Sequence, residues 1–224
     1  MPILAATALA AASTIAGKLL GLAWMVWVFK PLTTLLIIAV AAARLRDGGA
    51  YARAVCAGLL LSLAGDVLLI PDGLFVAGLV AFLLAHVAYL VAFTRDCPPL
   101  ARRGPFAAVA AVAAVLLTVL WPSLPAGLRV PVLAYVLMLG LMTAQALARA
   151  RHLDDPHARR AGIGGVLFLC SDALLAFDRF HAPLPLAALW VLGTYYPAQM
   201  LIARSINMRS EEHTSELQSP VVIS

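Results

Sequence analysis

The stretch LFVAGLVAFLLAHVAYLVAFT, residues 74–94, decides the fold class, because it is long, apolar and free of Lys, Arg, Asp and Glu. A membrane-spanning helix needs about 20 consecutive, mostly apolar residues. The whole chain has the same character: 63% of its 224 residues are hydrophobic, 12% are charged, and the mean hydropathy is +0.95. A soluble domain is typically ~45–50% apolar and ~25% charged. The sequence therefore predicts an all-α, polytopic integral membrane protein.

Working outward from this stretch, seven further segments have the length and composition of a membrane span. Glycine, proline and charged residues separate most of them, but residues 17–29 are interrupted only by Lys18, so the first boundary is the least defined. The sequence predicts one transmembrane domain over residues 1–208. Its eight expected helices cover residues 2–22, 27–44, 50–70, 74–94, 105–122, 129–149, 160–177 and 184–204.

The last part of the chain, residues 209–224, is polar and does not resemble the rest. Its segment RSEEHTSELQS, residues 209–219, resembles the translation of a common DNA-sequencing adapter. We interpret this tail as non-native and exclude it from the fold, as one excludes an expression scar. The tail contains a superficial grouping of metal-binding residue types that we do not interpret as a site: Glu211, Glu212, His213 and Glu216.

Arginine placement predicts the orientation of the bundle. The loops after the second, fourth and sixth expected helices are rich in arginine, whereas the opposite loops clearly carry only Arg129 and Arg179. Cytoplasmic loops are enriched in Lys and Arg, so both termini are expected in the cytoplasm, with the protein in a bacterial cytoplasmic (inner) membrane. This distribution accounts for the net charge of +5, and no nucleic acid is expected as a partner.

Ionisable side chains inside membrane spans are costly and commonly functional. Two of them are carboxylates, Asp66 and Asp172, late in the third and seventh expected helices. They are predicted as a catalytic pair, because one buried carboxyl group can hold a proton while the other stays ionised. The alternative is structural: Asp66 pairs with Lys30 or Arg129 and joins two helices. Ser62, one turn earlier, could donate a hydrogen bond to Asp66.

Several other polar residues are candidates for substrate binding. Lys30 either extends to the headgroups or pairs with an aspartate or a lipid phosphate. His86 either lines a cavity with Tyr89 or forms a hydrogen bond between helices. Tyr195 and Gln199 share a helix face and together suit a polar headgroup pocket. The predicted substrate-binding set is Lys30, His86, Tyr89, Ser171, Tyr195 and Gln199. No metal or other cofactor is predicted, since no H-x-x-x-H spacing is present.

The order of these residues resembles the YhhN family of lysoplasmalogenase-like membrane proteins. The resemblance is carried by Lys30 to Thr34, Gly65-Asp66, Phe82 to His86 with Tyr89, Pro131 to Tyr135, Phe168 to Leu175, and Tyr195-Tyr196 with Gln199. It implies an eight-helix enzyme that hydrolyses the vinyl ether bond of a lysophospholipid, the lysoplasmalogen. The implied products are a fatty aldehyde and glycerophosphoethanolamine or glycerophosphocholine. Asp66 and Asp172 match the two aspartates to which catalysis in the family is attributed.

Acid–base chemistry by two carboxylates agrees with this resemblance, because a vinyl ether is stable to base and labile to acid. One carboxylic acid would protonate the alkene carbon, and a carboxylate would stabilise the resulting cation and activate water. Three other functions stay open at this point. They are a metal-dependent amide or ester hydrolase that uses Asp66, His86 and Asp172, a proton-coupled transporter of lipids or small molecules, and a structural membrane protein.

Overall fold

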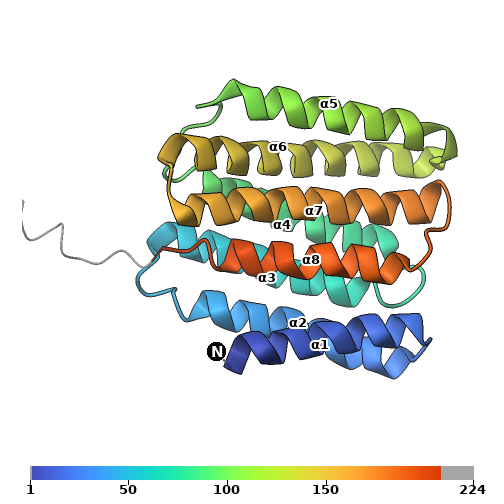
Figure 1. Cartoon of the computed structure of the whole chain (residues 1–224). Helices are drawn as coiled ribbons and strands as arrows, with labels where there is room; N and C mark the ends of the chain where they lie inside the picture. The colour runs from blue at the N-terminus through green and yellow to red at the C-terminus, as the bar shows by residue number, and fades with distance from the viewer. Residues whose placement is uncertain (1, 208–224) are drawn as a thin grey trace, which may run out of the picture.

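A computed structural model of the chain describes residues 2–207, which form eight α-helices joined by short turns (Figure 1). Helices α1 to α7 are long and apolar enough to cross a membrane, and α8, with 17 residues, is the shortest. The prediction of an all-α, eight-helix membrane bundle is therefore confirmed for this region. The helices are α1 (Pro2–Leu19), α2 (Ala23–Ala42), α3 (Gly49–Leu68), α4 (Phe75–Phe93), α5 (Arg103–Leu120), α6 (Arg129–Leu153), α7 (Pro156–Phe180) and α8 (Ala187–Ala203).

Six of the helices close a ring, in the order α2, α3, α4, α6, α7 and α8, with α8 packed back against α2. Helix α1 lies outside the ring against α2 and α8, and α5 lies outside it on α6 (Figure 1). The ring encloses a core of aromatic and aliphatic side chains that includes Tyr89, Phe93 and Phe168. Large apolar side chains such as Leu9, Val115 and Leu137 face outward, as expected for residues that contact lipid.

Two glycines let α3 and α4 approach closely next to Asp66. A Cβ atom at Gly58 would lie 2.3 Å from the Tyr89 ring, and one at Gly65 would lie 2.6 Å from the Phe82 ring. Small residues at helix interfaces are the usual means of close packing in membranes. Because Gly65 precedes Asp66, this packing also fixes where the carboxylate points.

Consecutive helices run antiparallel, so the loops divide between two ends of the bundle. The N-terminus and the loops after α2, α4 and α6 gather at one end, on the left in Figure 1. These loops contain the arginine-rich segments of the chain. The assignment of this arginine-rich end to the cytoplasm stays a prediction.

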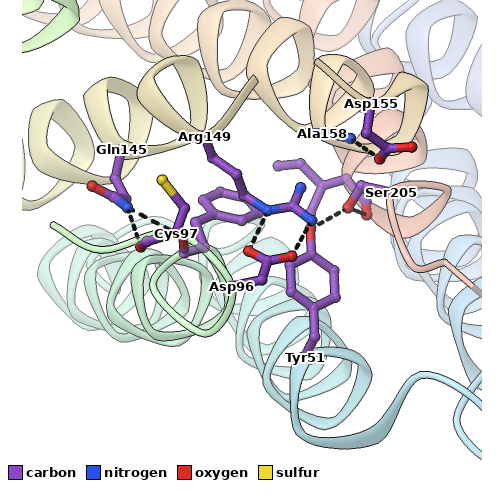
Figure 2. A network of polar contacts seen from close by, with 10 residues as sticks. Tyr51, Asp96, Cys97, Gln145, Arg149, Asp155, Ala158 and Ser205 are labelled. Atoms are coloured by element: carbon purple, nitrogen blue, oxygen red, sulfur yellow. Dashed lines mark hydrogen bonds and ion pairs between the residues drawn. The ribbon is translucent and has the colours of Figure 1, made fainter. Parts of the chain in front are cut away.

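A network of polar contacts ties the arginine-rich end together (Figure 2). The buried guanidinium group of Arg149, on α6, donates to both carboxylate oxygens of Asp96 at 2.7 and 2.6 Å. It also lies 4.7 Å from the ring centre of Tyr51, whose hydroxyl group is 2.7 Å from Ser205 Oγ. These contacts connect α3, α6, the α4–α5 loop and the segment after α8.

The α4–α5 loop is held by a second contact in the same network. Gln145 donates from its side-chain amide to the backbone carbonyls of Phe93 and Cys97, at 3.2 and 3.0 Å (Figure 2). Burial raises the pKa of the neighbouring Cys97 thiol, which therefore stays protonated and acts as a packing residue. The loop is thus anchored to α6 by an uncharged group as well as by an ion pair.

The helix boundaries differ most from the predicted ones in two places. The turn between α1 and α2 lies at residues 20–22, where Gly21 adopts a φ of +69°, so α2 begins at Ala23 rather than at residue 27. Helices α6 and α7 are each longer than predicted and leave only residues 154–155 between them. Asp155 caps α7 by accepting a hydrogen bond from Ala158 N, and Pro156 begins the helix. The tail and its Glu211, Glu212, His213 and Glu216 lie outside the described residues.

Candidate functional site

A cavity of 390 Å³ lies between the helices, and both candidate carboxylates line it. Asp66 reaches it from the last turn of α3, and Asp172 reaches it from the second half of α7. Both residues are closer to the end of the bundle opposite the arginine-rich end. The cavity therefore brings together two side chains that are far apart in the chain, as catalysis by a carboxylate pair requires.

Asp66 is almost fully buried and is surrounded by donors. Its Oδ2 atom accepts hydrogen bonds from the Thr34 hydroxyl at 2.6 Å and from the Tyr195 hydroxyl at 2.8 Å. Its Oδ1 atom lies 3.4 Å from Lys30 Nζ, which also donates to the Asp66 backbone carbonyl at 2.9 Å. Hydrogen bonds and a nearby cation favour the ionised form of a carboxyl group. Burial opposes this effect, so the surroundings of Asp66 supply the donors and the cation that an ionised carboxyl group inside the bundle needs.

Two prolines mark the helices that supply these donors. Pro31 follows Lys30 inside α2, and Pro197 lies two residues after Tyr195 inside α8. Proline removes a backbone hydrogen bond and bends a helix locally. Both helices are therefore locally perturbed where they contribute a side chain to Asp66.

Asp172 has fewer partners and faces the cavity. The Tyr135 hydroxyl donates to its Oδ2 atom at 2.5 Å, and His86 Nε2 lies 3.6 Å from the same atom. Its side chain is 14% exposed, compared with 2% for Asp66. No Lys or Arg among residues 2–207 forms an ion pair with it. Asp172 is therefore the carboxyl group with more access to a bound molecule and less support for its negative charge.

An aromatic cluster stands between the surroundings of the two carboxylates. Phe168 packs edge-on against His86, with ring centres 4.7 Å apart, and edge-on against Tyr195 at 5.5 Å. Phe82 contacts both Phe168 and Tyr195. Phe82 and Tyr195 belong to the wall of the cavity, and Phe168 is buried behind it.

A chain of hydrogen bonds extends from Asp66 into the core. Tyr195, which contacts Asp66, accepts from Gln199 Nε2 at 3.1 Å, and Tyr89 donates to Gln199 Oε1 at 2.7 Å. Ser62 contacts Tyr89 at 3.3 Å. The expectation that Ser62 donates to Asp66 is wrong, because its hydroxyl group points to the α4 side of α3, where Gly58 admits the Tyr89 ring.

The predicted substrate-binding residues divide into two groups. Lys30, Ser171 and Tyr195 line the cavity, and Ser171 also donates to the Val191 carbonyl at 3.0 Å, which joins α7 to α8. His86, Tyr89 and Gln199 are fully buried behind the wall of the cavity. Their contact with a substrate stays a prediction. His86 lies directly beside Asp172, whereas Gln199 reaches Asp66 through Tyr195, and Tyr89 reaches it through Gln199 and Tyr195.

Sequence reasoning gave no site role to Thr34, Tyr135, Lys18 or Arg179. Thr34 and Tyr135 occur in the motifs that carry the family resemblance, but a threonine inside a span is also typical of helix packing, and a tyrosine in the first turns of a span is typical of the membrane interface. Lys18 and Arg179 both line the cavity. Each lies in the last turn of its helix, where a basic residue is common for reasons of helix polarity. Position in the sequence alone therefore could not separate them from structural residues.

The described residues contain no group of three or more His, Cys, Asp or Glu side chains arranged to hold a metal ion. His86 is the only histidine near the carboxylates in residues 2–207, and it lies beside Asp172 rather than between Asp172 and Asp66. His86 therefore belongs to the surroundings of Asp172 and does not bridge the two carboxylates.

Comparison with known proteins shows which family the chain belongs to. The YhhN family model matches residues 25–206. Lysoplasmalogenase TMEM86B of Sus scrofa is 36% identical over 160 residues, which are 71% of this chain and 66% of the relative. Lysoplasmalogenase TMEM86A of Homo sapiens is 36% identical over 154 residues, 66% of this chain and 62% of the relative. The chain thus spans just under two thirds of these mammalian relatives.

A bacterial relative is matched over more of its length. A lysoplasmalogenase of Mycobacterium tuberculosis is 35% identical over 197 residues, which are 83% of this chain and 71% of the relative. No solved structure matches the chain. The family match begins near the start of α2 and ends after α8, so it includes every helix of the closed ring. On these grounds the chain is a member of the YhhN family.

Proposed function

We propose that the protein is a membrane-embedded hydrolase that cleaves the vinyl ether bond of lysoplasmalogen. The products would be a fatty aldehyde and glycerophosphoethanolamine or glycerophosphocholine. The observation that carries the proposal is that Asp66 and Asp172, in different surroundings, line one largely apolar cavity. The names of the mammalian and mycobacterial relatives support the same substrate class.

The cavity suits a lipid with a single chain. Helix α5 and the facing side of α6 supply an apolar wall that includes Leu116, Leu117 and Leu139. A hydrocarbon chain against this wall would leave the ether end of the lipid near the carboxylates. The polar end would then lie toward the end of the bundle where α1 and α7 terminate.

Asp172 is the better candidate for the general acid. It faces the cavity, and within residues 2–207 it has one hydroxyl donor and no ion pair with a Lys or an Arg. In its protonated form it would transfer its proton to the alkene carbon that is not bonded to the ether oxygen. The C–H bond forms as the alkene π bond breaks, which leaves an oxocarbenium ion and an ionised Asp172. Tyr135 would then stabilise the new carboxylate through its hydrogen bond.

Asp66 is the candidate for the permanent carboxylate. Its negative charge would stabilise the oxocarbenium ion, and it would accept a proton as water adds to the cationic carbon. The resulting hemiacetal would lose its hydroxyl proton to Asp172, and protonated Asp66 would give its proton to the departing glycerol oxygen. Aldehyde and alcohol are released, one water is consumed, and both carboxyl groups return to their initial states.

The buried polar residues have positioning roles in this scheme. Tyr89 and Gln199 hold the hydroxyl group of Tyr195, which in turn holds Asp66. His86 packs against Tyr135, with ring centres 5.2 Å apart, and lies beside Asp172. Lys30 and Thr34 complete the surroundings of Asp66. Ser171 and Tyr195 line the cavity, as Tyr135 does, and could also contact the glycerol part of the substrate.

The test is aldehyde release by the detergent-purified full chain. Lysoplasmenylethanolamine and the matching 1-acyl lysophospholipid are compared, each with and without a strong chelator. Aldehyde from the vinyl ether alone, unaffected by chelation, is expected. Asp66→Asn and Asp172→Asn should lower kcat by at least about 100-fold, whereas Asp47→Asn, in the exposed α2–α3 loop, removes the same charge and should retain activity.

Other outcomes would overturn the proposal. Activity that disappears with the chelator would favour a metal-dependent hydrolase. Wild-type-like rates in both aspartate variants would remove the acid–base mechanism. If neither aldehyde nor fatty acid is released, the vinyl ether and the ester are both excluded as substrates, and lipid transport becomes the favoured function.

A further inference from the structure

The cavity has two basic residues at its mouth that the proposed reaction does not use. Lys18 lies in the last turn of α1 and Arg179 in the last turn of α7, and both line the cavity together with Asp66 and Asp172. We propose that Lys18 and Arg179 form a binding site for the phosphate group of the lipid substrate and select phospholipids over neutral lipids. This inference rests on the proposed function.

Neither cation is committed to a carboxylate in residues 2–207. The ion pairs of this region include Lys30 with Asp66, but none involves Lys18 or Arg179. The nearest acidic neighbour in the sequence, Asp178, instead accepts a hydrogen bond from Leu184 N at 2.8 Å. Asp178 also lines the cavity, but it forms no ion pair with either cation in the part of the chain that the structure describes. Two positive groups that line one cavity and are not held in an ion pair are suited to an anionic ligand.

Arg179 is held in place without using its hydrogen-bond donors. Its guanidinium carbon lies 3.9 Å from the ring centre of Phe75, so the two planar groups form a cation–π contact. Such a contact uses the face of the guanidinium group and leaves the N–H donors at its edge free. Those donors match the geometry of a phosphate, and Lys18 would add a second positive charge.

The charge distribution of the cavity orients the lipid. The phosphate would be repelled by Asp66 and Asp172 and attracted to Lys18 and Arg179, which line the same cavity. The apolar residues that α5 and α6 contribute to the cavity suit the hydrocarbon chain. In a lysoplasmalogen the ether oxygen lies between the chain and the phosphate. A lipid bound in this orientation presents its vinyl ether to the carboxylates.

Lys18 is contributed by a helix outside the region that defines the family. The family match begins at residue 25, whereas α1 ends at Leu19. The carboxylates and the helices that hold them lie inside the match. In this proposal α1, which lies apart from the carboxylates, takes part in selecting the headgroup.

The experiment compares two vinyl ether lipids that differ in the phosphate. Lysoplasmenylethanolamine carries it, and 1-alkenylglycerol does not. Lys18→Gln and Arg179→Gln should each raise KM for the phospholipid about tenfold or more, as expected for loss of a charge-assisted contact, with KM for 1-alkenylglycerol unchanged. Arg179→Lys should restore part of the loss, and Arg46→Gln, an equal charge change at the opposite end, should have no effect.

A binding measurement separates this inference from the proposed reaction. A 1-alkyl lysophosphoethanolamine lacks the reactive alkene, and its dissociation constant for the purified protein can be measured by calorimetry. Weaker binding to Lys18→Gln supports the phosphate site even if no vinyl ether is hydrolysed. Three results would overturn the inference. The first is equal affinity of the wild type and both variants, and the second is no binding to the wild type. The third is an equal loss of affinity in the variants for the phospholipid and for 1-alkenylglycerol.

Discussion

The hydroxyl group of Tyr135 donates a 2.5 Å hydrogen bond to Oδ2 of Asp172, across the interface between α6 and α7. This is the only hydrogen bond to the Asp172 side chain within residues 2–207. The tyrosine therefore determines the direction in which the proposed acid presents its second oxygen to the cavity. The sequence predicted a catalytic role for Asp172 but no site role for Tyr135.

The first prediction concerns this contact. Tyr135→Phe should lower kcat about tenfold to a hundredfold, because the carboxyl group loses its orientation while the fold is retained. Tyr51→Phe is the matched control. It removes the same hydroxyl group from a tyrosine at the far end of the bundle, where that group contacts Ser205 at 2.7 Å. Equal losses of activity in both variants would show that the effect is on stability and not on Asp172.

The second prediction concerns Lys30 and Asp66. Lys30→Met should leave a buried carboxylate without its cation and lower the free energy of unfolding by roughly 3–5 kcal/mol. Adding Asp66→Asn should recover part of that loss, because the uncompensated charge is then removed. The measurement is a double-mutant cycle of unfolding in detergent. Strictly additive effects would show that the two side chains, 3.4 Å apart, are not coupled.

The third prediction concerns the close approach of α3 and α4. Gly65→Ala places a methyl group 2.6 Å from the Phe82 ring, so the helices must separate or the ring must move. We expect a destabilisation of about 1–3 kcal/mol together with reduced activity, because Asp66 is the next residue. Gly193→Ala, where a Cβ meets no atom within 4 Å, is the control and should be neutral or stabilising in thermal unfolding.

The fourth prediction separates stability from catalysis at the arginine-rich end. Asp96→Ala leaves the buried guanidinium group of Arg149 without its acceptors and should cost about 1–3 kcal/mol. The KM for the lipid should not change, because the network lies away from the cavity. The exposed pair of Asp154 with Arg159 provides the comparison: Asp154→Ala should cost ~0–1 kcal/mol. A raised KM in Asp96→Ala would contradict the separation of the two ends.

The fifth prediction concerns the orientation in the membrane. Single cysteines introduced for Asp47 and for Asp72, in a chain whose native cysteines are replaced, lie in loops at opposite ends of the bundle. In intact bacterial cells a membrane-impermeant maleimide should label position 72 and not position 47. The opposite pattern would place the arginine-rich end outside and reverse the predicted topology.

Hydropathy was sufficient for the number and order of the helices, but not for their ends. The start of α2 was misplaced because Ala23 to Val26 are as apolar as the spans on both sides, and only the conformation of Gly21 reveals the turn. The end of α6 was placed at Arg149 because an arginine usually marks a loop. In the structure Arg149 is buried inside the helix, since Asp96 and Tyr51 from other elements compensate its charge.

The two aspartates were predictable because charge inside a span is expensive and therefore informative. Their partners were not, since a tyrosine or threonine in a span costs little and many do nothing beyond packing. Ser62 illustrates a different difficulty. Its spacing from Asp66 is correct for a contact within α3, but the space left by Gly58 brings Tyr89 closer to it. Which of two geometrically allowed partners a hydroxyl group chooses depends on the neighbouring helix.

Helix α5 rests on α6 outside the closed ring, yet it supplies part of the apolar wall of the cavity. The wall is one helix thick at this point: the substrate's chain would lie against its inner face, and its outer face, where Val115 is exposed, is open to the acyl chains of the membrane. Turnover should consequently depend on the lipid that surrounds α5, and rates in micelles would understate this dependence.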